Sequence, residues 1–331
     1  INHIVKTGLS RESYKREYVW NTANHLRISI DRLKSHGVKY SYDALHQLVS
    51  EENGSQLEYK NPDAVGNLYE TLDRSDRKYE SGGKLTKDDK WNYHYDTLGN
   101  LVLKAPFILE GKNPDTRWRP HCWHYKWNAN GTLKWVIQPD GAKTDFEYDA
   151  LGRRTAKITH QTITRYLWDG NVLLHEWSYP TTDRPQAKVS ELGEVAYEQE
   201  PSDNVTTWVY DEGGYTPIGK LVNGDRYSIV SDYIGRPVQC FDDKGGIVWK
   251  TDYDIYGRLK NLQGERGFVP FRQMGQYEDV ELDGLYYNRF RYYDSFSGVY
   301  LSQDPIGLLG GVNFYGYVND SNSLVDPLVK T

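Results

Sequence analysis

The chain is poor in cysteine, methionine and aliphatic residues. Its 331 residues include two cysteines and one methionine, and the mean hydropathy is −0.76. Two cysteines are too few for a disulfide scaffold. We therefore expect Cys122 and Cys240 to be reduced thiols, although the sequence leaves a pairing between them open. The low aliphatic content argues against one thick apolar core and favours a thin sheet with two partly wet faces.

The chain also lacks long apolar runs and an excess of positive charge. No run of about 18 apolar residues occurs, so the sequence predicts no membrane-spanning helix. A net charge of −6 and a pI near 5.9 give no basic surface of the kind that binds nucleic acid. No signal peptide is visible, and because the chain begins at Ile1 we expect it to be a piece of a longer protein.

Aromatic residues and one repeated turn motif are abundant. The chain contains 28 Tyr and 10 Trp, which are residue types that favour strands. Residues 148–153 read Tyr-Asp-Ala-Leu-Gly-Arg, and bulky and polar residues alternate on either side, at 143–148 and 154–159. The alternation predicts strands, and Asp followed three residues later by Gly predicts a type I turn. The unit is therefore a strand, a tight turn and a second strand.

Copies of this unit recur along the chain. Close copies begin at Tyr95 and Tyr253, and weaker ones lie before Tyr95, from Trp20 onward, and between Tyr95 and Tyr253. The turn glycines Gly131 and Gly152 are 21 residues apart, and the glycines at 214 and 235 have the same separation. A period in this range is typical of repeat architectures. The alternative is a sandwich whose hairpins resemble one another by chance.

The motif Tyr-Asp-x-x-Gly-Arg at this spacing resembles the YD repeat of the Rhs family. The segments 284–294 and 301–308, with Asp326-Pro327-Leu328, resemble the Rhs core-associated region. The resemblance covers essentially the whole chain. It implies an all-β fold in which YD-repeat hairpins form a continuous spiralling sheet, part of a hollow shell around a toxin. Residues 1–267 would form the YD-repeat sheet, and residues 268–331 would be the core-associated region that closes the shell.

Two stretches interrupt the repeats. Residues 105–122 contain three prolines and are predicted to be an inserted loop. Residues 178–206 are rich in Pro, Thr, Asp and Glu and are predicted to be an exposed excursion. Within the second stretch, residues 191–200 are a candidate short helix.

Asp304 and Asp326 are the candidate catalytic residues. Each precedes a proline, so the residues alone favour a structural role, with Asp as an N-cap and Pro at the first helical position. In the Rhs proteins that the chain resembles, two aspartates at matching positions cut the chain just downstream and free the toxin. The implied chemistry is that of an aspartyl dyad, in which one carboxyl stays protonated and the pair supplies a base and an acid.

Four positions depart from the family pattern. Val299 stands where Arg is usual, and Ser321 stands where Pro is usual. Val329 replaces a Gly, and Lys330 replaces the Leu after which the cut normally falls. By alignment the scissile bond would join Lys330 and Thr331. Two outcomes stay open, a cut at or near this bond and a shell in which the departures have disabled cleavage.

Other candidate chemistry is weaker. Residues 121–124 contain two His and one Cys, but no second ligand pair stands nearby, so a strand with a half-buried Cys is the expectation. Asp242 and Asp243 before Gly245 are explained by a turn without calcium. We expect no cofactor and no metal.

The resemblance implies the C-terminal part of an Rhs-type shell that is at most an intramolecular aspartyl autoprotease. Its expected partners are a toxin domain after residue 331, an N-terminal delivery domain or secretion-system component, and a chaperone. The protein would be made in a bacterial cytoplasm and exported or delivered to target cells, without binding nucleic acid or spanning a membrane. The alternative is an aromatic-rich glycan-binding adhesion module without catalysis.

Overall fold

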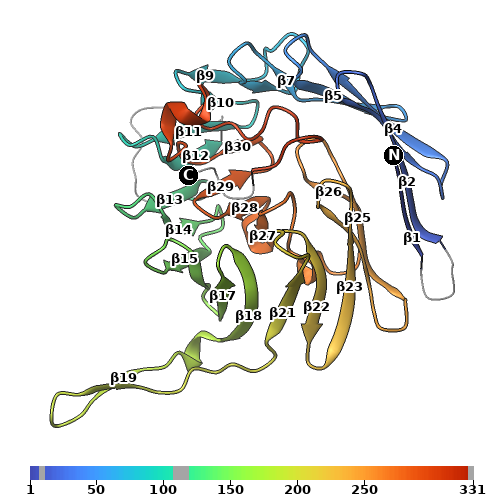
Figure 1. The fold of residues 1–331 in the computed structure, drawn as a ribbon. Coiled ribbons are helices and arrows are strands. Elements are labelled where there is room, and N and C mark those ends of the chain that lie inside the picture. The colour runs from blue at the N-terminus through green and yellow to red at the C-terminus, as the bar shows by residue number, and fades with distance from the viewer. Residues whose placement is uncertain (7–11, 107–118, 327–331) are drawn as a thin grey trace.

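The chain folds into antiparallel sheets that curve around its own C-terminal region, as a computed structural model shows (Figure 1). The structure describes residues 1–6, 12–106 and 119–326. Two sheets of consecutive strands form a curved wall, and the strands after residue 276 lie inside the curve. The predicted all-β fold, with YD-repeat hairpins in a spiralling sheet, is confirmed.

The first sheet has six strands that pair in sequence order, each antiparallel to its neighbours. A separate two-stranded pair follows it and leads the chain to the larger sheet. The strands of the first sheet and of the pair are β1 (Asn2–Lys6), β2 (Glu12–Trp20), β3 (Leu26–Asp31), β4 (His36–Tyr42), β5 (Leu48–Asn53) and β6 (Gln56–Tyr59), then β7 (Asn61–Pro62) and β8 (Leu68–Tyr69).

The second sheet has 16 strands, which also follow one another in sequence order except where β18 pairs with β21. Of the predicted loop at 105–122, the first two residues belong to β12, and 107–118 lie outside the described residues. The strands are β9 (Lys78–Glu80), β10 (Lys84–Lys87), β11 (Trp91–Tyr95), β12 (Leu101–Pro106), β13 (Trp123–Trp127), β14 (Leu133–Ile137), β15 (Lys143–Tyr148), β16 (Arg154–Ile158), β17 (Thr162–Asp169), β18 (Val172–Pro180), β21 (Thr206–Tyr210), β22 (Pro217–Val222), β23 (Asp225–Ser231), β24 (Pro237–Phe241), β25 (Ile247–Tyr253) and β26 (Leu259–Gln263).

The candidate helix at 191–200 is instead half of a projecting hairpin, formed by β19 (Ala187–Val189) and β20 (Val195–Tyr197) (Figure 1). The helix prediction is wrong for two reasons. Gly193 takes a φ of +80° and its N–H donates to the carbonyl of Ser190 at 2.9 Å, so the backbone turns back there. The valine and tyrosine of β20 are residue types that favour strands.

One set of hydrogen bonds explains the repeated turn motif. Oδ1 of Asp149 accepts the backbone N–H groups of Leu151 and Arg153, both at 2.9 Å, and Oδ2 accepts Nε of Arg153 at 2.6 Å. Gly152 has a φ of +73°, a backbone conformation that is strained for most residues with a side chain. Its N–H donates to the carbonyl of Asp149 at 3.0 Å. The same contacts recur at 232–236 and 254–258.

The aromatic residue before a turn joins one repeat to the previous one. The hydroxyl of Tyr148 donates to the carbonyl of Leu133 at 2.8 Å, and Nε1 of Trp127 donates to the carbonyl of Leu101 at 2.7 Å. In both cases the accepting residue lies two positions after the glycine of the preceding turn. The position therefore requires a large apolar ring that also carries a hydrogen-bond donor, as Tyr and Trp do.

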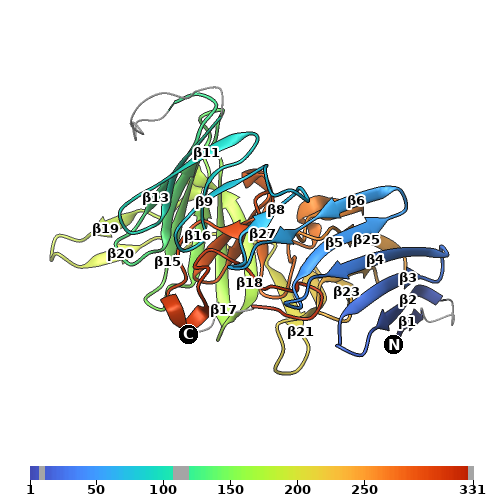
Figure 2. The same cartoon turned by 90° about the horizontal axis from the view of Figure 1, so that it is seen from above.

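A four-stranded antiparallel sheet lies inside the curve of the wall (Figure 1). Figure 2 shows β2–β5 with β23 and β25 on one side of the molecule and β9–β17 on the other. Helical structure in the described residues is limited to short 3₁₀ segments. The remaining elements are β27 (Tyr277–Asp279), β28 (Leu285–Asn288), β29 (Arg291–Asp294) and β30 (Val299–Tyr300), with η2 (Thr181–Asp183), η3 (Arg266–Phe268), η4 (Val280–Leu282) and η5 (Gly307–Gly310).

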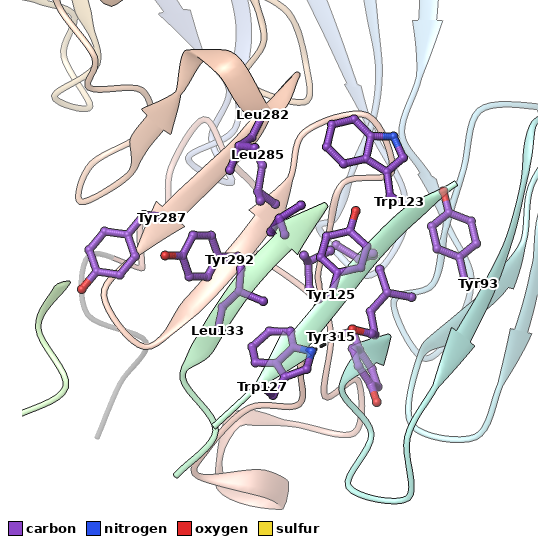
Figure 3. Packing of buried hydrophobic residues seen from close by; sticks show 14 of the residues in the cluster. Tyr93, Trp123, Tyr125, Trp127, Leu133, Leu282, Leu285, Tyr287, Tyr292 and Tyr315 are labelled. Carbon is purple, nitrogen blue, oxygen red and sulfur yellow. Dashed lines mark hydrogen bonds between the residues drawn. The ribbon is translucent and has the colours of Figure 1, made fainter. Parts of the chain in front are cut away.

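The inner sheet and the wall share one hydrophobic core (Figure 3). Tyr93, Trp127 and Leu133 of the large sheet pack in one buried cluster with Leu285 and Tyr292 of the inner sheet. The expectation that both faces of the sheet are partly wet is therefore wrong for this part of the wall. The inner face of the wall is covered by apolar side chains of the C-terminal region. The low aliphatic content of the chain does not predict this contact.

A buried ion pair fastens the inner sheet to the large sheet. Nη1 of Arg154 lies 2.6 Å from Oδ2 of Asp279, and the two side chains are 1% and 0% exposed. The guanidinium carbon lies 4.5 Å from the ring centroid of Tyr287 and 4.6 Å from that of Tyr166. Burial acts to lower the pKa of Arg154, but Asp279 and the surrounding tyrosines outweigh burial and raise it, so the guanidinium stays charged.

Side chains also close the seam between the first sheet and the last strands of the second. Nη2 of Arg16 lies 2.6 Å from Oδ1 of Asp252, across β2 and β25. Nζ of Lys260 lies 3.7 Å from Oε1 of Glu51, a side chain that is only 3% exposed. Burial raises the pKa of Glu51 to about 7, against the opposing effect of Lys260. Arg16 and Asp252 thus join the two sheets through opposite charges, whereas burial disfavours the charged form of Glu51 beside Lys260.

Candidate functional site

Asp304 and Asp326 meet at one buried guanidinium. Nη2 of Arg291 lies 3.2 Å from Oδ2 of Asp304 and 3.4 Å from Oδ2 of Asp326. The side chain of Arg291 is 2% exposed, and those of the two aspartates are 12% and 16% exposed. Two carboxylates that are 22 residues apart in the sequence therefore share one cation.

Local turn geometry sets the position of Asp304. Its N–H donates to the carbonyl of Phe314 at 2.8 Å, and its Oδ1 accepts the N–H of Ile306 at 3.0 Å. The N–H of Gly307, where η5 begins, donates to the carbonyl of Asp304 at 2.9 Å. The N-cap prediction is therefore wrong for Asp304, because η5 begins at Gly307 and its N-cap is Ile306. Asp304 instead forms a turn with Oδ1, while Oδ2 faces Arg291.

A glycine leaves room for this carboxylate. A Cβ atom on Gly310 would lie 2.5 Å from Oδ2 of Asp304, which is closer than any non-bonded carbon–oxygen contact allows. Gly310 is not at a positive φ, so the restriction comes from the neighbouring carboxylate and not from the backbone.

Asp326 is positioned through its backbone. Nδ2 of Asn288 donates to the carbonyl of Asp326 at 3.1 Å, and the N–H of Asp326 donates to the hydroxyl of Tyr317 at 3.4 Å. Burial raises the pKa of Tyr317, so this hydroxyl remains protonated and neutral. Nδ2 of Asn288 also donates to the hydroxyl of Tyr300 at 2.6 Å. The inner sheet therefore holds the end of the described chain.

An aromatic ring and a carbonyl fix the guanidinium between the aspartates. The Cζ atom of Arg291 lies 3.6 Å from the ring centroid of Tyr300, and Nη1 donates to the carbonyl of Phe314 at 3.3 Å. Burial raises the pKa of Tyr300 well above its ordinary value, against the opposing effect of Arg291. A neutral ring therefore faces the cation, in the arrangement of a cation–π contact.

The four departures from the family pattern fall into two groups. Val299 is 3% exposed and belongs to the shared core, and the hydroxyl of Ser321, also buried, donates to the carbonyl of Ile255 at 3.4 Å. Val329 and Lys330, with the predicted scissile bond that follows, lie outside the described residues.

Arg291 could not be identified as a site residue from the sequence. Its neighbours along β29 are two tyrosines, and its acidic partners follow 13 and 35 positions later. The one signal in the sequence is a charged residue inside an aromatic strand, because a buried charge needs an opposite charge nearby. That signal predicts an acidic partner for Arg291, but it does not identify which Asp or Glu of the chain is the partner.

The other candidate residues have ordinary structural environments. Cys122 and Cys240 are buried free thiols in separate clusters. Oδ1 of Asp242 accepts the N–H groups of Lys244 and Gly246, as the turn prediction requires. Across residues 1–6, 12–106 and 119–326, no group of three His, Cys, Asp or Glu side chains is placed to hold a metal ion. No helix in the same ranges is long and apolar enough to cross a membrane.

A curved ladder of YD turns that encloses a C-terminal inner sheet defines a YD-repeat shell. The chain belongs to the Teneurin YD-shell family, whose family model matches residues 11–309. The resemblance to Rhs and YD-repeat proteins stated from the sequence is therefore confirmed.

Several curated relatives carry the names of Rhs proteins and toxins. The probable deoxyribonuclease RhsB of Dickeya dadantii (strain 3937) is 29% identical over 319 residues, which cover 88% of this chain and 20% of RhsB. The double-stranded DNA deaminase toxin A of Burkholderia cenocepacia (strain H111) is 28% identical over 338 residues, which cover 94% of this chain and 22% of that protein. The chain thus spans about a fifth of the length of these relatives.

Solved structures show the same fold. The crystal structure of TcdB2-TccC3-Cdc42 matches with a TM-score of 0.63 and 17% sequence identity, over 99% of this chain and 17% of that chain. The crystal structure of TcdB2-TccC3 matches with the same TM-score and 18% identity.

Proposed function

We propose that this chain is the C-terminal part of a shell that encloses a toxin domain and cuts itself near residue 330 to free that domain. The observation that carries the proposal is the meeting of Asp304 and Asp326 at Arg291, next to the end of the described chain. Relatives with toxin names and a wall that curves around the C-terminal region support it.

The two carboxylates would divide the work of hydrolysis. One takes a proton from water as the water oxygen attacks the scissile carbonyl, and the other gives its proton to the carbonyl oxygen, so that a diol intermediate forms. The first carboxyl then passes the proton taken from water to the leaving amine, and the second regains a proton from a hydroxyl group of the diol. The C–N bond breaks and a new carboxyl group forms. Because the bond belongs to the same chain, effective molarities of up to about 10⁵–10⁸ M are available to well-aligned groups. A single slow turnover is sufficient for release.

Two residues at the end of the chain that differ from the family pattern should affect the rate of self-cleavage. In the family pattern a Gly and a Leu stand where this chain has Val329 and Lys330. Replacing both, by Val329→Gly and Lys330→Leu, should speed the cut by restoring the conformation in which the family's chain enters the site. Ser321→Pro is the matching change upstream of Asp326.

The proposed protein consists of a repeat wall and a core-associated region, and it has three kinds of partner. Residues 1–267 would be the repeat wall and 268–331 the core-associated region, with the toxin domain after residue 331. An N-terminal delivery domain or secretion-system component, and a chaperone, would be the other partners. The protein would be made in a bacterial cytoplasm and delivered to target cells.

The alternative, an aromatic glycan-binding face on the sheet, has little support. Trp127, Trp208 and Trp249 are buried in the core clusters. Among the described residues, the large aromatic side chains that are clearly exposed are Tyr197, in β20, and Phe296, in the turn between β29 and β30, so they form no stripe.

Encapsulation is tested by proteolysis of a reporter peptide that contains a protease site. The peptide is fused after Thr331 of the Asp304→Asn variant, so that no self-cleavage releases it, and a matched fusion carries it before Ile1. We expect the C-terminal peptide to resist protease until the shell is unfolded and the N-terminal peptide to be cut at once. Equal cutting of the two peptides would contradict enclosure.

A further inference from the structure

A cavity lies away from the two aspartates. It occupies about 480 Å³ between the start of the large sheet and residues 282–296 of the C-terminal region. This volume is in the range of small-molecule sites, about 300–1,000 Å³. None of the residues that line it belongs to the Asp304, Asp326 and Arg291 site.

Aromatic rings form the sheet side of the cavity. Trp91 and Tyr93 come from β11, and Trp123 and Tyr125 come from β13, two strands further along the sheet. Figure 3 shows Tyr93, Trp123 and Tyr125 beside Leu282 and Leu285 of the opposite wall. Trp91 is half-buried and lines the cavity, with Nζ of Lys104 5.2 Å from its ring centroid. Flat rings of this kind pack well against the C–H face of a sugar ring.

Two polar atoms in this wall have no partner within the described part of the chain. Trp123 is 8% exposed and Tyr125 is 6% exposed, yet neither Nε1 of Trp123 nor the hydroxyl of Tyr125 makes a hydrogen bond there. The neighbouring Tyr93 differs, because its hydroxyl donates to Oδ2 of Asp88 at 2.6 Å. Neither atom belongs to the fully buried unpartnered atoms of the described chain, so both can be reached from the cavity and can form hydrogen bonds with the hydroxyl groups of a ligand.

The charges of the cavity favour an uncharged ligand. At its floor, Nζ of Lys104 lies 2.9 Å from Oδ2 of Asp294, so this cation is already neutralised. Asp89 at the rim has no partner in the described ranges, although Lys90 stands beside it in the chain, and the carboxylate of Asp283 interacts electrostatically with Arg266. Carboxylates without cations accept hydrogen bonds from hydroxyl groups and repel anions.

We propose that this cavity binds a neutral saccharide. One ring packs against Trp91, and its hydroxyl groups bind Nε1 of Trp123, the hydroxyl of Tyr125 and the carboxylate of Asp89. Uronic acids and sugar phosphates are excluded by the rim carboxylates. The inference does not depend on self-cleavage, because the two sites share no residue.

The test uses four sugars as probes and measures binding to the purified chain by calorimetry and saturation-transfer NMR. Glucose, galactose and N-acetylglucosamine are the neutral probes, and glucuronate is the anionic probe. We expect at least one neutral sugar to bind with a dissociation constant in the millimolar range, about 1 mM or a few times weaker. Glucuronate should not bind.

Three variants separate this site from non-specific binding. Trp123→Phe and Tyr125→Phe each remove one polar atom that lines the cavity, so we expect binding weaker by about fivefold or more with unchanged circular dichroism. Trp249→Phe is the matched control, because it removes a buried unpartnered indole N–H outside the cavity and should leave binding unchanged. The proposal is overturned if no neutral sugar binds, if glucuronate binds equally well, or if Trp123→Phe and Tyr125→Phe bind as the unmutated chain does.

Discussion

Nη2 of Arg291 lies 3.2 Å from Oδ2 of Asp304, and this contact joins a strand of the inner sheet to the turn that precedes η5. The other oxygen of Asp304 accepts the N–H of Ile306, so both oxygens of the carboxylate are held. A carboxylate restrained in this way keeps one orientation, which is the condition for reproducible proton transfer. The same nitrogen also holds Asp326.

Gly310→Ala should slow self-cleavage without unfolding the protein. The new methyl group would lie 2.5 Å from Oδ2 of Asp304 and would displace it, and a misplacement of about 1 Å can cost about 100-fold in rate. We expect the release of a reporter fused after Thr331 to slow at least tenfold, measured by gel densitometry over time. Leu309→Ala, at a side chain that is 90% exposed, is the control. Equal rates in the two variants would show that the position of Asp304 does not matter.

Asp279→Asn should strongly destabilise the protein. The change leaves Arg154 charged and buried without its partner, which costs about 3–5 kcal/mol in the free energy of unfolding. The double variant Arg154→Met, Asp279→Leu removes both charges and should recover most of that loss. Urea unfolding followed by tryptophan fluorescence measures both effects. A double variant as unstable as Asp279→Asn would mean that the ion pair is not the cause.

Asp149→Ala should weaken one repeat. The substitution removes the acceptor for two backbone N–H groups and for Nε of Arg153, and we expect a loss of about 2 kcal/mol in stability. Asp203→Ala, at an exposed turn residue, is the control and should change stability by less than about 0.5 kcal/mol. Similar melting temperatures for the two variants would refute the role assigned to the motif's aspartate.

Glu51 should make stability depend on pH. Its pKa is raised from 4.5 to about 7 in the folded protein, mainly by burial, so the folded state binds the proton more tightly than the unfolded state. The contribution of this group to stability is full below about pH 4.5 and is lost as the pH rises through about 7. Glu51→Gln removes this loss, so its melting temperature should exceed that of the unmutated protein at pH 8 and match it near pH 4.5. The reverse order at pH 8 would show that the contact with Lys260 outweighs burial.

The local structure could be predicted because it depends on neighbours in the sequence. Asp149 and Gly152 are three residues apart and determine their turn by themselves, so the repeats were visible without a structure. Gly193 and the β-favouring residues after it likewise determine a hairpin by themselves, which is the reason that the helix predicted at 191–200 is wrong.

The assembly of the site could not be predicted in the same way. Arg291, Asp304 and Asp326 lie in different elements, and only the folding of the C-terminal region against the inner sheet brings them together. The dry core between the inner sheet and the wall is also a long-range feature, because Tyr292 and Trp127 belong to separate elements with no shared local pattern. The family resemblance identified the two aspartates, whereas the arginine between them required the structure.

The intact mass of a fusion that carries a reporter domain after Thr331 tests the central claim most directly. We predict that the unmutated fusion splits into two fragments with a boundary next to residue 330. Asp304→Asn and Asp326→Asn should each remain whole, with unchanged circular dichroism, because each variant leaves one carboxylate on Arg291. If the fusion still splits with Asp326→Asn in place, or if the unmutated fusion never splits, self-cleavage by these two aspartates is contradicted.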